Sequence, residues 1–157
     1  MPQRRPTLRS RDIAQASLLC SAVVRRILLL PPTDPDPGET ARRDVKLVPV
    51  WEDGVTGVAG WSDHGWEALR IAYEHPEVER LVLLATPVPD WSDVPPIAAK
   101  TLLLFGAGDE RSGSKAARWW KAHIPHARIE MSPRLGHDLL AERWPRTLSH
   151  LAPGTVR

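Results

Sequence analysis

Three residues in this chain have the side chains and the chain order that nucleophilic acyl transfer requires. Ser62 follows the run V-T-G-V-A-G-W, Asp109 follows T-L-L-L-F-G-A-G, and His137 follows an alternating run and a short loop. A hydroxyl is a weak nucleophile until an imidazole takes its proton, and a carboxylate must hold that imidazole in the right tautomer. The sequence therefore predicts that Ser62, Asp109 and His137 form a catalytic triad.

Each of these residues also has an ordinary structural interpretation when it is considered alone. An aspartate after glycine, as at Asp109, is typical of a turn. A histidine after glycine, as at His137, is typical of a helix cap or an exposed position. The chain order Ser, Asp, His, with each residue after a predicted strand, favours the triad over these separate explanations.

The segment around Ser62 has the pattern of a nucleophile elbow, which is a tight turn between a strand and a helix. A short run of β-branched and small residues reaches Gly60, and apolar residues at helical spacing follow Ser62. A small residue is needed at such a corner because a Cβ would strike the opposing segment. His64 stands where a second glycine is usual and Gly65 follows one place later, so an ordinary strand-to-helix turn is the alternative.

The remaining chain predicts the elements that would position these residues. Apolar runs at 80–85 and 101–105 predict buried strands, and the alternating run at 127–131 predicts an edge strand. Helical spacing predicts helices over 114–124 and 138–151. Strands that alternate with helices predict an α/β protein with a doubly wound, mostly parallel sheet, whose site lies at the carboxyl ends of the strands.

The front of the sheet is less regular. Residues 27–30 predict a short buried strand that ends at Pro31 and Pro32, and the proline-rich segment 33–39 predicts a loop. Residues 40–51 are ambiguous, since they begin like a helix and then alternate like a strand. We expect a helix there, because parallel strands require a crossover connection.

The chain divides into an N-terminal arm or helix at 1–25 and a core at 26–157. The apolar stretch 13–24 follows several arginines, as in an export signal, but Asp12 interrupts the approach and no cleavage site follows. This stretch fits an amphipathic helix, and it is too short and too charged at its ends to span a membrane. Because the single Cys20 cannot form an internal disulfide, a cytoplasmic location is expected.

Composition limits the classes of function. The 157 residues, 42% of them hydrophobic, are enough for one domain with one core. The formal net charge is +2 and basic residues are mixed with acidic ones, so we expect neither a nucleic-acid nor a membrane partner. The histidines are spread out and no C-x-x-C or H-E-x-x-H motif occurs, so we expect no metal and no cofactor.

From Gly57 to about Leu151 the sequence resembles the α/β-hydrolase fold family, specifically the serine hydrolases whose elbow reads G-W-S-D-G-G. Here the elbow reads G-W-S-D-H-G at residues 60–65. The H-P and R-L-V-L-L run at 75–84, the L-L-F-G run ending in aspartate at 103–109, and the P and G-H loop at 125–137 also resemble family motifs. The resemblance implies a reduced α/β-hydrolase core without a cap domain.

The resemblance also implies a role for each site residue. Ser62 would be the nucleophile, His137 the general base and acid, and Asp109 the orienting carboxylate. The backbone N–H of Asp63 would donate to the oxyanion. Asp90 is the alternative carboxylate, because some family members place their acid after the preceding strand.

Two departures from the family pattern affect what we expect. The second oxyanion donor of the family comes from a loop after an early strand, where this chain has Pro31 and Pro32, which lack an N–H. Thr33 or a water molecule would then have to substitute. The sheet is also short at its front, which predicts a homodimer, an N-terminal segment folded over the edge, or poor stability.

Two functions therefore fit the sequence. The first is a serine hydrolase that cleaves small carboxylic ester, thioester or lactone bonds, with an apolar acyl site lined by Trp61, Trp66 or Trp91. The second is a catalytically weakened or truncated relative that keeps the scaffold and acts as a binding or interaction protein. The two functions differ in whether the oxyanion has both of its hydrogen-bond donors, because the triad is common to both.

Overall fold

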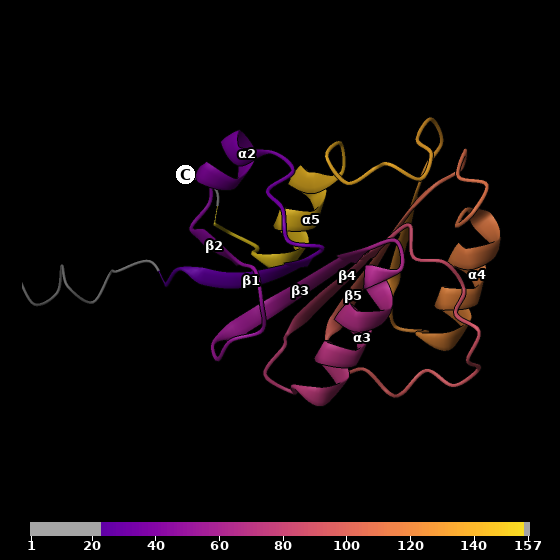
Figure 1. Ribbon diagram of the computed structural model, residues 1–157, viewed down its shortest axis with the longest axis horizontal. Helices are drawn as coiled ribbons and strands as arrows, with labels where there is room; N and C mark the ends of the chain where they lie inside the picture. Colours follow the sequence, from indigo (N-terminus) through magenta and orange to yellow (C-terminus); the bar gives the residue numbers. More distant parts are fainter. Residues whose placement is uncertain (1–22, 156–157) are drawn as a thin grey trace, which may run out of the picture.

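Residues 23–155, described by a computed structural model, form a six-stranded parallel sheet with helices on both faces (Figure 1). The strands are β1 (Arg25–Leu30), β2 (Val45–Val48), β3 (Val55–Trp61), β4 (Arg80–Leu84), β5 (Lys100–Gly106) and β6 (Arg128–Ser132). The helices are α2 (Pro37–Ala41), α3 (His64–Glu74), α4 (Ser114–His123) and α5 (Trp144–Leu151). The predicted α/β class is confirmed, and every neighbouring strand pair in this sheet is parallel.

The sheet is doubly wound, because the chain adds β2 on one side of β1 and then returns to add β3 to β6 on the other side. The strand order is β2-β1-β3-β4-β5-β6, so the order reverses between β1 and β3. Ligands of open α/β sheets bind at the carboxyl ends of the strands that flank such a switch point. Ser62 follows β3 directly and therefore lies at this position.

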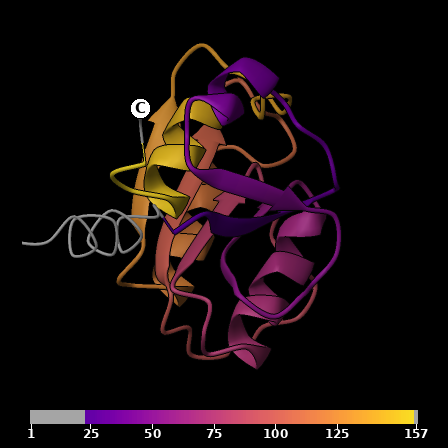
Figure 2. The same cartoon turned by 90° about the vertical axis from the view of Figure 1, so that its left-hand side faces the viewer.

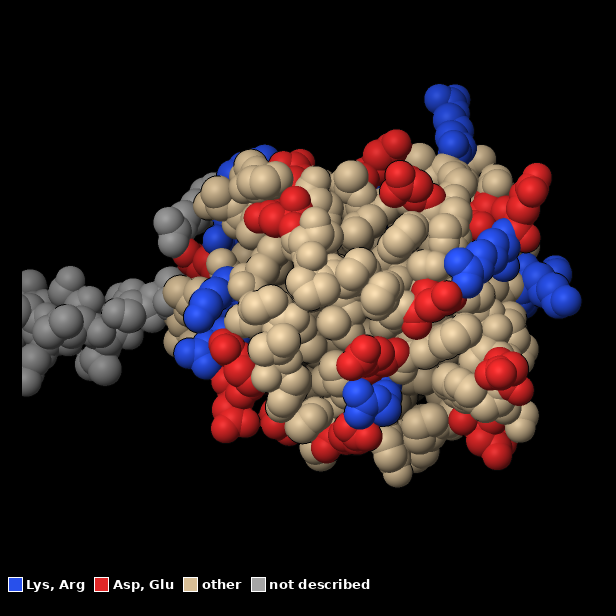
Figure 3. Space-filling model, viewed as in Figure 1, with Lys and Arg blue, Asp and Glu red and all other residues tan. Residues whose placement is uncertain are grey.

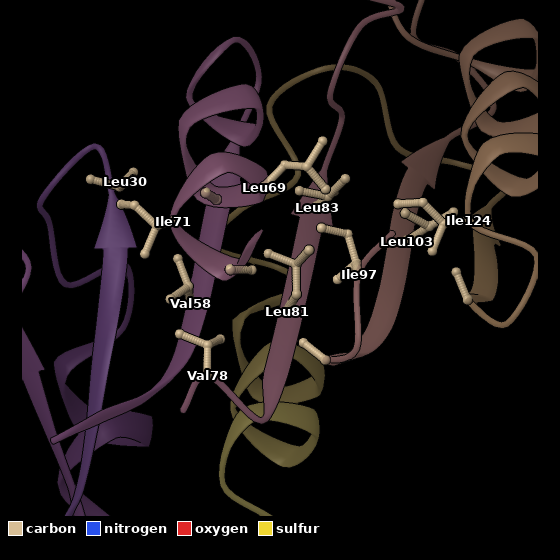
Figure 4. Packing of buried hydrophobic residues seen from close by; sticks show 14 of the residues in the cluster. Leu30, Val58, Leu69, Ile71, Val78, Leu81, Leu83, Ile97, Leu103 and Ile124 are labelled. Carbon is tan, nitrogen blue, oxygen red and sulfur yellow. The ribbon is translucent and has the colours of Figure 1, made fainter. Parts of the chain in front are cut away.

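The strands carry continuous apolar runs because both faces of the sheet are covered. Successive side chains of a strand point to opposite faces. Leu81 and Leu83 of β4 belong to a core cluster that includes residues of α3 and α4, and Figure 4 shows this packing. Val82 and Leu84 point the other way and pack with Trp144 and other residues of α5. Figure 2 shows α3 and α5 on opposite sides of the sheet.

Helix α3 carries the chain away from Ser62 and covers one face of the sheet. Leu69 and Ile71 are among its buried residues, while Arg70 on the solvent side pairs with acidic residues one turn before and one turn after it. The helix ends at His75, whose backbone is extended, because a residue before proline disfavours the helical conformation.

The predicted helix over 40–51 is wrong. The segment contains β2, which pairs in parallel with β1, and the crossover is made by the short helix α2, which covers the end of the predicted loop and only the first two residues of the predicted helix. Helix α2 begins at Pro37 and is capped by Asp36, whose carboxylate accepts a hydrogen bond from the Glu39 backbone N–H. A cap and a proline in the first turn are sufficient to start this helix, so the crossover needs fewer residues than expected.

The predicted helix over 138–151 is also shorter than expected. Residues 138 and 139 have no regular structure and 140–143 form turns, and α5 begins at Trp144 with Pro145 in its first turn. Proline is favoured there because the first N–H groups of a helix have no intrahelical acceptor. Trp144 is fully buried, and its indole N–H donates to the Thr40 hydroxyl at 2.9 Å, which fixes the start of α5 against α2.

The edges of the sheet are β2 and β6. The predicted edge position of the 127–131 run is confirmed, and Ile129 and Met131 of β6 are each 37% exposed. The expected homodimer or covering of an edge stays a prediction. The predicted N-terminal helix at 13–24 and Cys20 lie largely or wholly outside the described residues.

Charged groups are dispersed over the face of the molecule seen in Figure 3, where Lys and Arg lie among Asp and Glu. This mixture agrees with the formal net charge of +2. Within residues 23–155, no helix has both the length and the apolar character needed to cross a bilayer.

Candidate active site

The turn between β3 and α3 holds Ser62 in a backbone conformation that few serines adopt. Its φ angle is +56°, in the left-handed region, which costs a residue with a Cβ on the order of 1–3 kcal/mol. Its N–H donates to the Leu84 carbonyl of β4 at 2.8 Å, and its own carbonyl accepts from the Gly65 N–H at 3.0 Å. These bonds hold the hydroxyl at the sheet edge in the strained turn of a nucleophile elbow.

Two glycines allow the chain to double back at this turn. A Cβ on Gly60 would lie 2.5 Å from the His64 carbonyl oxygen, and a Cβ on Gly65 would overlap the Thr86 side chain. Gly65, one place later than the usual motif position, is therefore the residue that the packing against β4 requires. His64 is exposed at the start of α3. The ordinary G-x-S-x-G spacing is thus replaced here without loss of the turn.

Ser62, His137 and Asp109 form a continuous hydrogen-bonded row. The Ser62 Oγ lies 2.8 Å from His137 Nε2, and His137 Nδ1 lies 2.8 Å from Asp109 Oδ2. When Nδ1 carries the proton and donates it to the carboxylate, Nε2 is left as an acceptor for the serine hydroxyl. The Ser62 residue is 5% exposed and the Asp109 side chain 1%, whereas the His137 side chain is 27% exposed. The row thus opens to solvent at the histidine.

The loop after β5 binds the Asp109 carboxylate through its backbone. The N–H groups of Arg111 and Ser112 donate to Asp109 Oδ1 at 2.9 and 3.0 Å, which leaves Oδ2 for His137. Gly106 lets this loop approach the histidine loop, because a Cβ there would lie 2.5 Å from the Gly136 carbonyl oxygen. A buried carboxylate with both oxygens hydrogen-bonded can orient an imidazole.

Trp61 binds the histidine loop from the end of β3. Its indole N–H donates to the His137 carbonyl at 2.9 Å, and the two rings lie with centroids 5.2 Å apart. Trp61 was expected to line an acyl site, which stays a prediction, and its contacts place it where it can also hold the histidine loop. Sequence reasoning found the residue but missed this contact, which joins segments 76 residues apart.

Arg111 places a guanidinium beside the serine hydroxyl, and the sequence analysis did not anticipate it. Its Nη1 lies 3.3 Å from Ser62 Oγ, and its Nη2 forms an ion pair with the Asp63 carboxylate. The side chains of Arg111 and Asp63 are 55% and 51% exposed. The only sequence signal is the position of the arginine two residues after Asp109, in the run D-E-R.

Neither a family model nor a curated protein sequence matches this chain. Solved structures do match it. The carboxylesterase CesB from Bacillus subtilis has a TM-score of 0.62 at 14% identity, and the match covers 84% of this chain and 85% of that one. The CIB-like hydrolase from Thermoplasma acidophilum has a TM-score of 0.60 at 13% identity, and the match covers 80% and 84% of the two chains. The fold is that of the α/β hydrolases.

A third solved structure matches over a smaller part of both chains. A protein of unknown function from Agrobacterium tumefaciens, assigned to the α/β hydrolases, matches with a TM-score of 0.53 at 20% identity. The match covers 64% of this chain and 53% of that one, so this chain spans about half the length of that relative. At such identities the likeness establishes the fold, and any activity has to be argued from the side chains.

The α/β-hydrolase fold places the end of β1 beside the elbow, where a second oxyanion donor would be needed. Leu30 pairs with Gly60, so Pro31 and Pro32 lie next to the turn and offer no N–H. The next N–H belongs to Thr33, which is exposed. On the other side, the Asp63 N–H begins α3, where N–H groups have no intrahelical acceptor. The expected departure at 31–32 therefore lies at the predicted place.

Two hollows flank the triad. A pocket of about 600 Å³ begins at Asp63 and runs between α3 and the loop before β5, and Trp66 and Trp91 line it. The Trp66 indole N–H donates to the Pro87 carbonyl at 3.0 Å, which fixes one wall. A second hollow of about 350 Å³ is lined by the acid loop, including Arg111. Of the three predicted substrate-binding tryptophans, Trp66 and Trp91 line the larger pocket.

The alternative carboxylate Asp90 does not take the place of Asp109. Asp90 is exposed in the segment after β4, and Asp109 makes the contact with His137. Residues 85–99, between β4 and β5, contain neither helix nor strand. In the part of the chain that the structure describes, no group of three or more His, Cys, Asp or Glu side chains is arranged to hold a metal ion.

Proposed function

We propose that the protein is a serine hydrolase that cleaves small carboxylic ester, thioester or lactone bonds through an acyl-enzyme on Ser62. The observation that carries this proposal is the unbroken row from Ser62 Oγ through the His137 ring to the Asp109 carboxylate, with both gaps at 2.8 Å. Such distances allow proton transfer without rearrangement of the site. The α/β-hydrolase fold supports the proposal, since CesB, which shares it, is a carboxylesterase.

The proposed reaction has two halves that use the same proton carrier. His137 Nε2 accepts the proton of Ser62 as Oγ attacks the carbonyl carbon and forms a tetrahedral oxyanion. The imidazolium then protonates the leaving alcohol, thiol or ring oxygen as its bond to carbon breaks. In the second half, His137 takes a proton from water, which attacks the acyl-enzyme, and returns it to Oγ as the acid is released. Asp109 stabilises the imidazolium in both halves.

The oxyanion is the weak point of this proposal. The Asp63 N–H is one donor, and the Thr33 N–H or a water molecule would have to be the second, because Pro31 and Pro32 have none. Loss of one donor of this kind costs about 10²–10³ in kcat. We therefore expect turnover to be slow in comparison with esterases that have two backbone donors.

The pocket beside the elbow suits a small apolar group of the substrate. Its volume of about 600 Å³ falls within the usual range of small-molecule sites, and its lining includes Trp66, Leu69 and Trp91. We propose that this pocket binds the apolar part of the substrate next to Asp63. A small-molecule substrate, with neither nucleic acid nor membrane as partner, and a cytoplasmic location belong to the same proposal.

A fluorophosphonate probe tests the proposal directly, because it phosphonylates only an activated serine. The label should lie on Ser62 in a peptide map, should be absent in Ser62→Ala, and should fall sharply in His137→Ala. Ser149→Ala is the matched control, since Ser149 is exposed on α5 and lines neither hollow beside the triad. An intact fold without label on Ser62 would show that the proposal is wrong.

A second function rests on a specific observation, the two prolines where an oxyanion donor is expected. A protein with an intact triad and an incomplete anion site would bind esters or react once, and would then release product poorly. Stoichiometric labelling of Ser62 together with no turnover of p-nitrophenyl acetate after the first equivalent would favour this weakened relative. Continuous turnover that Ser62→Ala abolishes would favour the hydrolase.

A further inference from the structure

Arg111 has a position that the proposed proton transfers do not require. The guanidinium Nη1 lies 3.3 Å from Ser62 Oγ, the atom that would attack the substrate. A cation at this place opposes the charge that forms on His137 when Ser62 is deprotonated. The same cation attracts the negative charge that develops on Ser62 Oγ, so with a neutral ester its two effects oppose each other.

Arg111 is held in place by its backbone N–H and by its guanidinium. The backbone N–H of Arg111 donates to the Asp109 carboxylate at 2.9 Å, so the residue is tied to the same acid that orients His137. Its Nη2 pairs with the carboxylate of Asp63, the residue after the nucleophile. Arg111 also lines the 350 Å³ hollow, together with Lys115. An incoming group would thus meet a positioned cation directly beside Ser62.

The partner of Arg111 in the empty site can be exchanged at little cost. Both members of the Arg111–Asp63 pair are about half exposed, and exposed ion pairs contribute little to stability because solvent screens them. A guanidinium binds a carboxylate through two parallel hydrogen bonds, which a neutral group cannot reproduce. A substrate carboxylate could therefore replace the Asp63 carboxylate. It would form both hydrogen bonds with the guanidinium, and the bound substrate would displace water from around this ion pair.

We propose that Arg111 is a specificity-determining residue that selects substrates whose acyl group carries a carboxylate close to the scissile carbonyl. The inference rests on the proposed function of Ser62. An oxygen hydrogen-bonded to the guanidinium lies within roughly 6 Å of Ser62 Oγ, given ordinary hydrogen-bond lengths. This distance fits half-esters of dicarboxylic acids in which one to three carbons separate the two carboxyl carbons.

The anion belongs on the acyl group rather than on the leaving group. The acyl group stays bonded to Ser62 Oγ in the acyl-enzyme, so its carboxylate keeps the contact with Arg111 through both halves of the reaction. The leaving group must instead lie within reach of His137 Nε2, which protonates it. The negative charge of the acyl group also offsets the repulsion between Arg111 and the imidazolium.

Two methyl esters of equal size test the proposal. Monomethyl succinate and methyl butyrate differ in that a carboxylate replaces a methyl group, and methanol release gives kcat/KM for each. We expect the wild-type protein to prefer monomethyl succinate at least tenfold at low salt, and this preference should fall at high salt because of screening. Arg111→Met should lower the succinate-to-butyrate ratio at least tenfold, chiefly by raising KM for the succinate.

Three further variants separate binding of the anion from general damage. Arg111→Lys keeps the charge without the fork and should give an intermediate ratio. Asp63→Asn removes the competing carboxylate and should raise the ratio. Arg118→Met, an exposed arginine on α4, is the matched control and should leave the ratio unchanged.

The outcomes distinguish this inference from the proposed function. If Ser62 is labelled by the fluorophosphonate and both esters are hydrolysed, but wild type and Arg111→Met show the same ratio, the inference is overturned and the hydrolase stands. If Ser62 is not labelled and neither ester is cleaved, the proposed function fails and the inference fails with it. A folded Arg111→Met protein that keeps the label and loses the succinate preference supports both.

Discussion

The two sides of Ser62 differ in how completely this chain builds them. On the side of β5 and β6, His137 is held by the Asp109 carboxylate and by the Trp61 indole, and Asp109 is held by two backbone N–H groups. On the side of β1, two prolines stand next to the elbow and the nearest following N–H belongs to the exposed Thr33. The proton-transfer side is therefore assembled and the anion-binding side is not.

This difference indicates which step would limit the rate of the proposed ester hydrolysis. Proton transfer needs side chains at fixed distances, and these are in place at 2.8 Å. Stabilisation of the oxyanion needs donors that point at one spot, and backbone N–H groups are the usual source. The reactivity of Ser62 towards a phosphonylating probe and its turnover of esters should therefore differ more than in a protein with both sides complete.

The largest effect is expected from breaking the better-built side. Asp109→Asn keeps the size of the side chain but no longer stabilises the imidazolium, and it favours the wrong tautomer of His137. We expect kcat for ester hydrolysis to fall by about 10⁴. The matched control is Asp90→Asn, because Asp90 is exposed and Asp109 rather than Asp90 contacts His137. A loss of similar size in the control would contradict this assignment.

The next effect should come from repairing the weaker side. Pro32→Gly introduces an N–H beside the elbow, and we expect kcat for a neutral ester to rise about tenfold, part of what a full donor contributes. Glycine also increases the entropy of the unfolded chain, so the melting temperature should fall slightly. Pro35→Gly, in the same segment but further from β1, controls for flexibility. An unchanged or lower kcat would mean that the missing N–H does not limit the reaction.

Much of the fold and of the triad could be predicted because the evidence for them is local. In β4, four successive apolar residues indicated a strand covered on both faces, and Leu81 and Val82 do face opposite cores. The serine, the aspartate and the histidine each follow a predicted parallel strand. They were therefore expected at the same edge of the sheet, where the carboxyl ends of the strands lie. Ser62, Asp109 and His137 were all found in this way, although their catalytic roles stay predictions.

The features that were missed depend on contacts between distant segments or on short connections. Strand β2 was taken for a helix because the crossover formed by α2 is only five residues long. The contact of Trp61 with the histidine loop was missed, since nothing in the local sequence shows that its indole N–H reaches that loop. Arg111 has a long, flexible side chain, and its contact with Ser62 joins residues 49 positions apart. No spacing rule predicts such a contact.

An effect of similar size, in the opposite direction, is expected when the support behind His137 is weakened. Trp61→Phe keeps a ring against the imidazole but removes the donor to the His137 carbonyl. We expect kcat to fall about tenfold with KM nearly unchanged, and stability to fall by about 1 kcal/mol, the usual value of one hydrogen bond. Trp119→Phe, a half-buried tryptophan on α4, is the control. If Trp61→Phe raised KM alone, Trp61 would be a pocket residue, as the sequence first indicated.

The smallest effect concerns the ion pairs that tie β6 to α5 behind the histidine loop. The hydrogen bond and the charge of Arg146, with the nearby charges of Arg143 and Arg128, lower the pKa of Glu130 below its ordinary value of 4.5. A carboxyl group whose pKa is lowered by folding stabilises the folded state above its unfolded pKa, and this contribution is lost as pH falls through the lowered value.

Glu130→Gln should therefore reduce the free energy of unfolding at pH 7 by about 1 kcal/mol or less, since the group is partly exposed and screened. The difference between wild type and variant should shrink as the pH falls below 4.5, and it should be lost once the pH has passed through the lowered pKa of Glu130, where the carboxyl group is neutral in the folded state as well. Urea unfolding at pH 7 and pH 3 measures it. A difference that grew on acidification would mean that Glu130 is not the group that anchors α5 to β6, and that the proton-transfer side owes its rigidity to the packing of Trp144 instead.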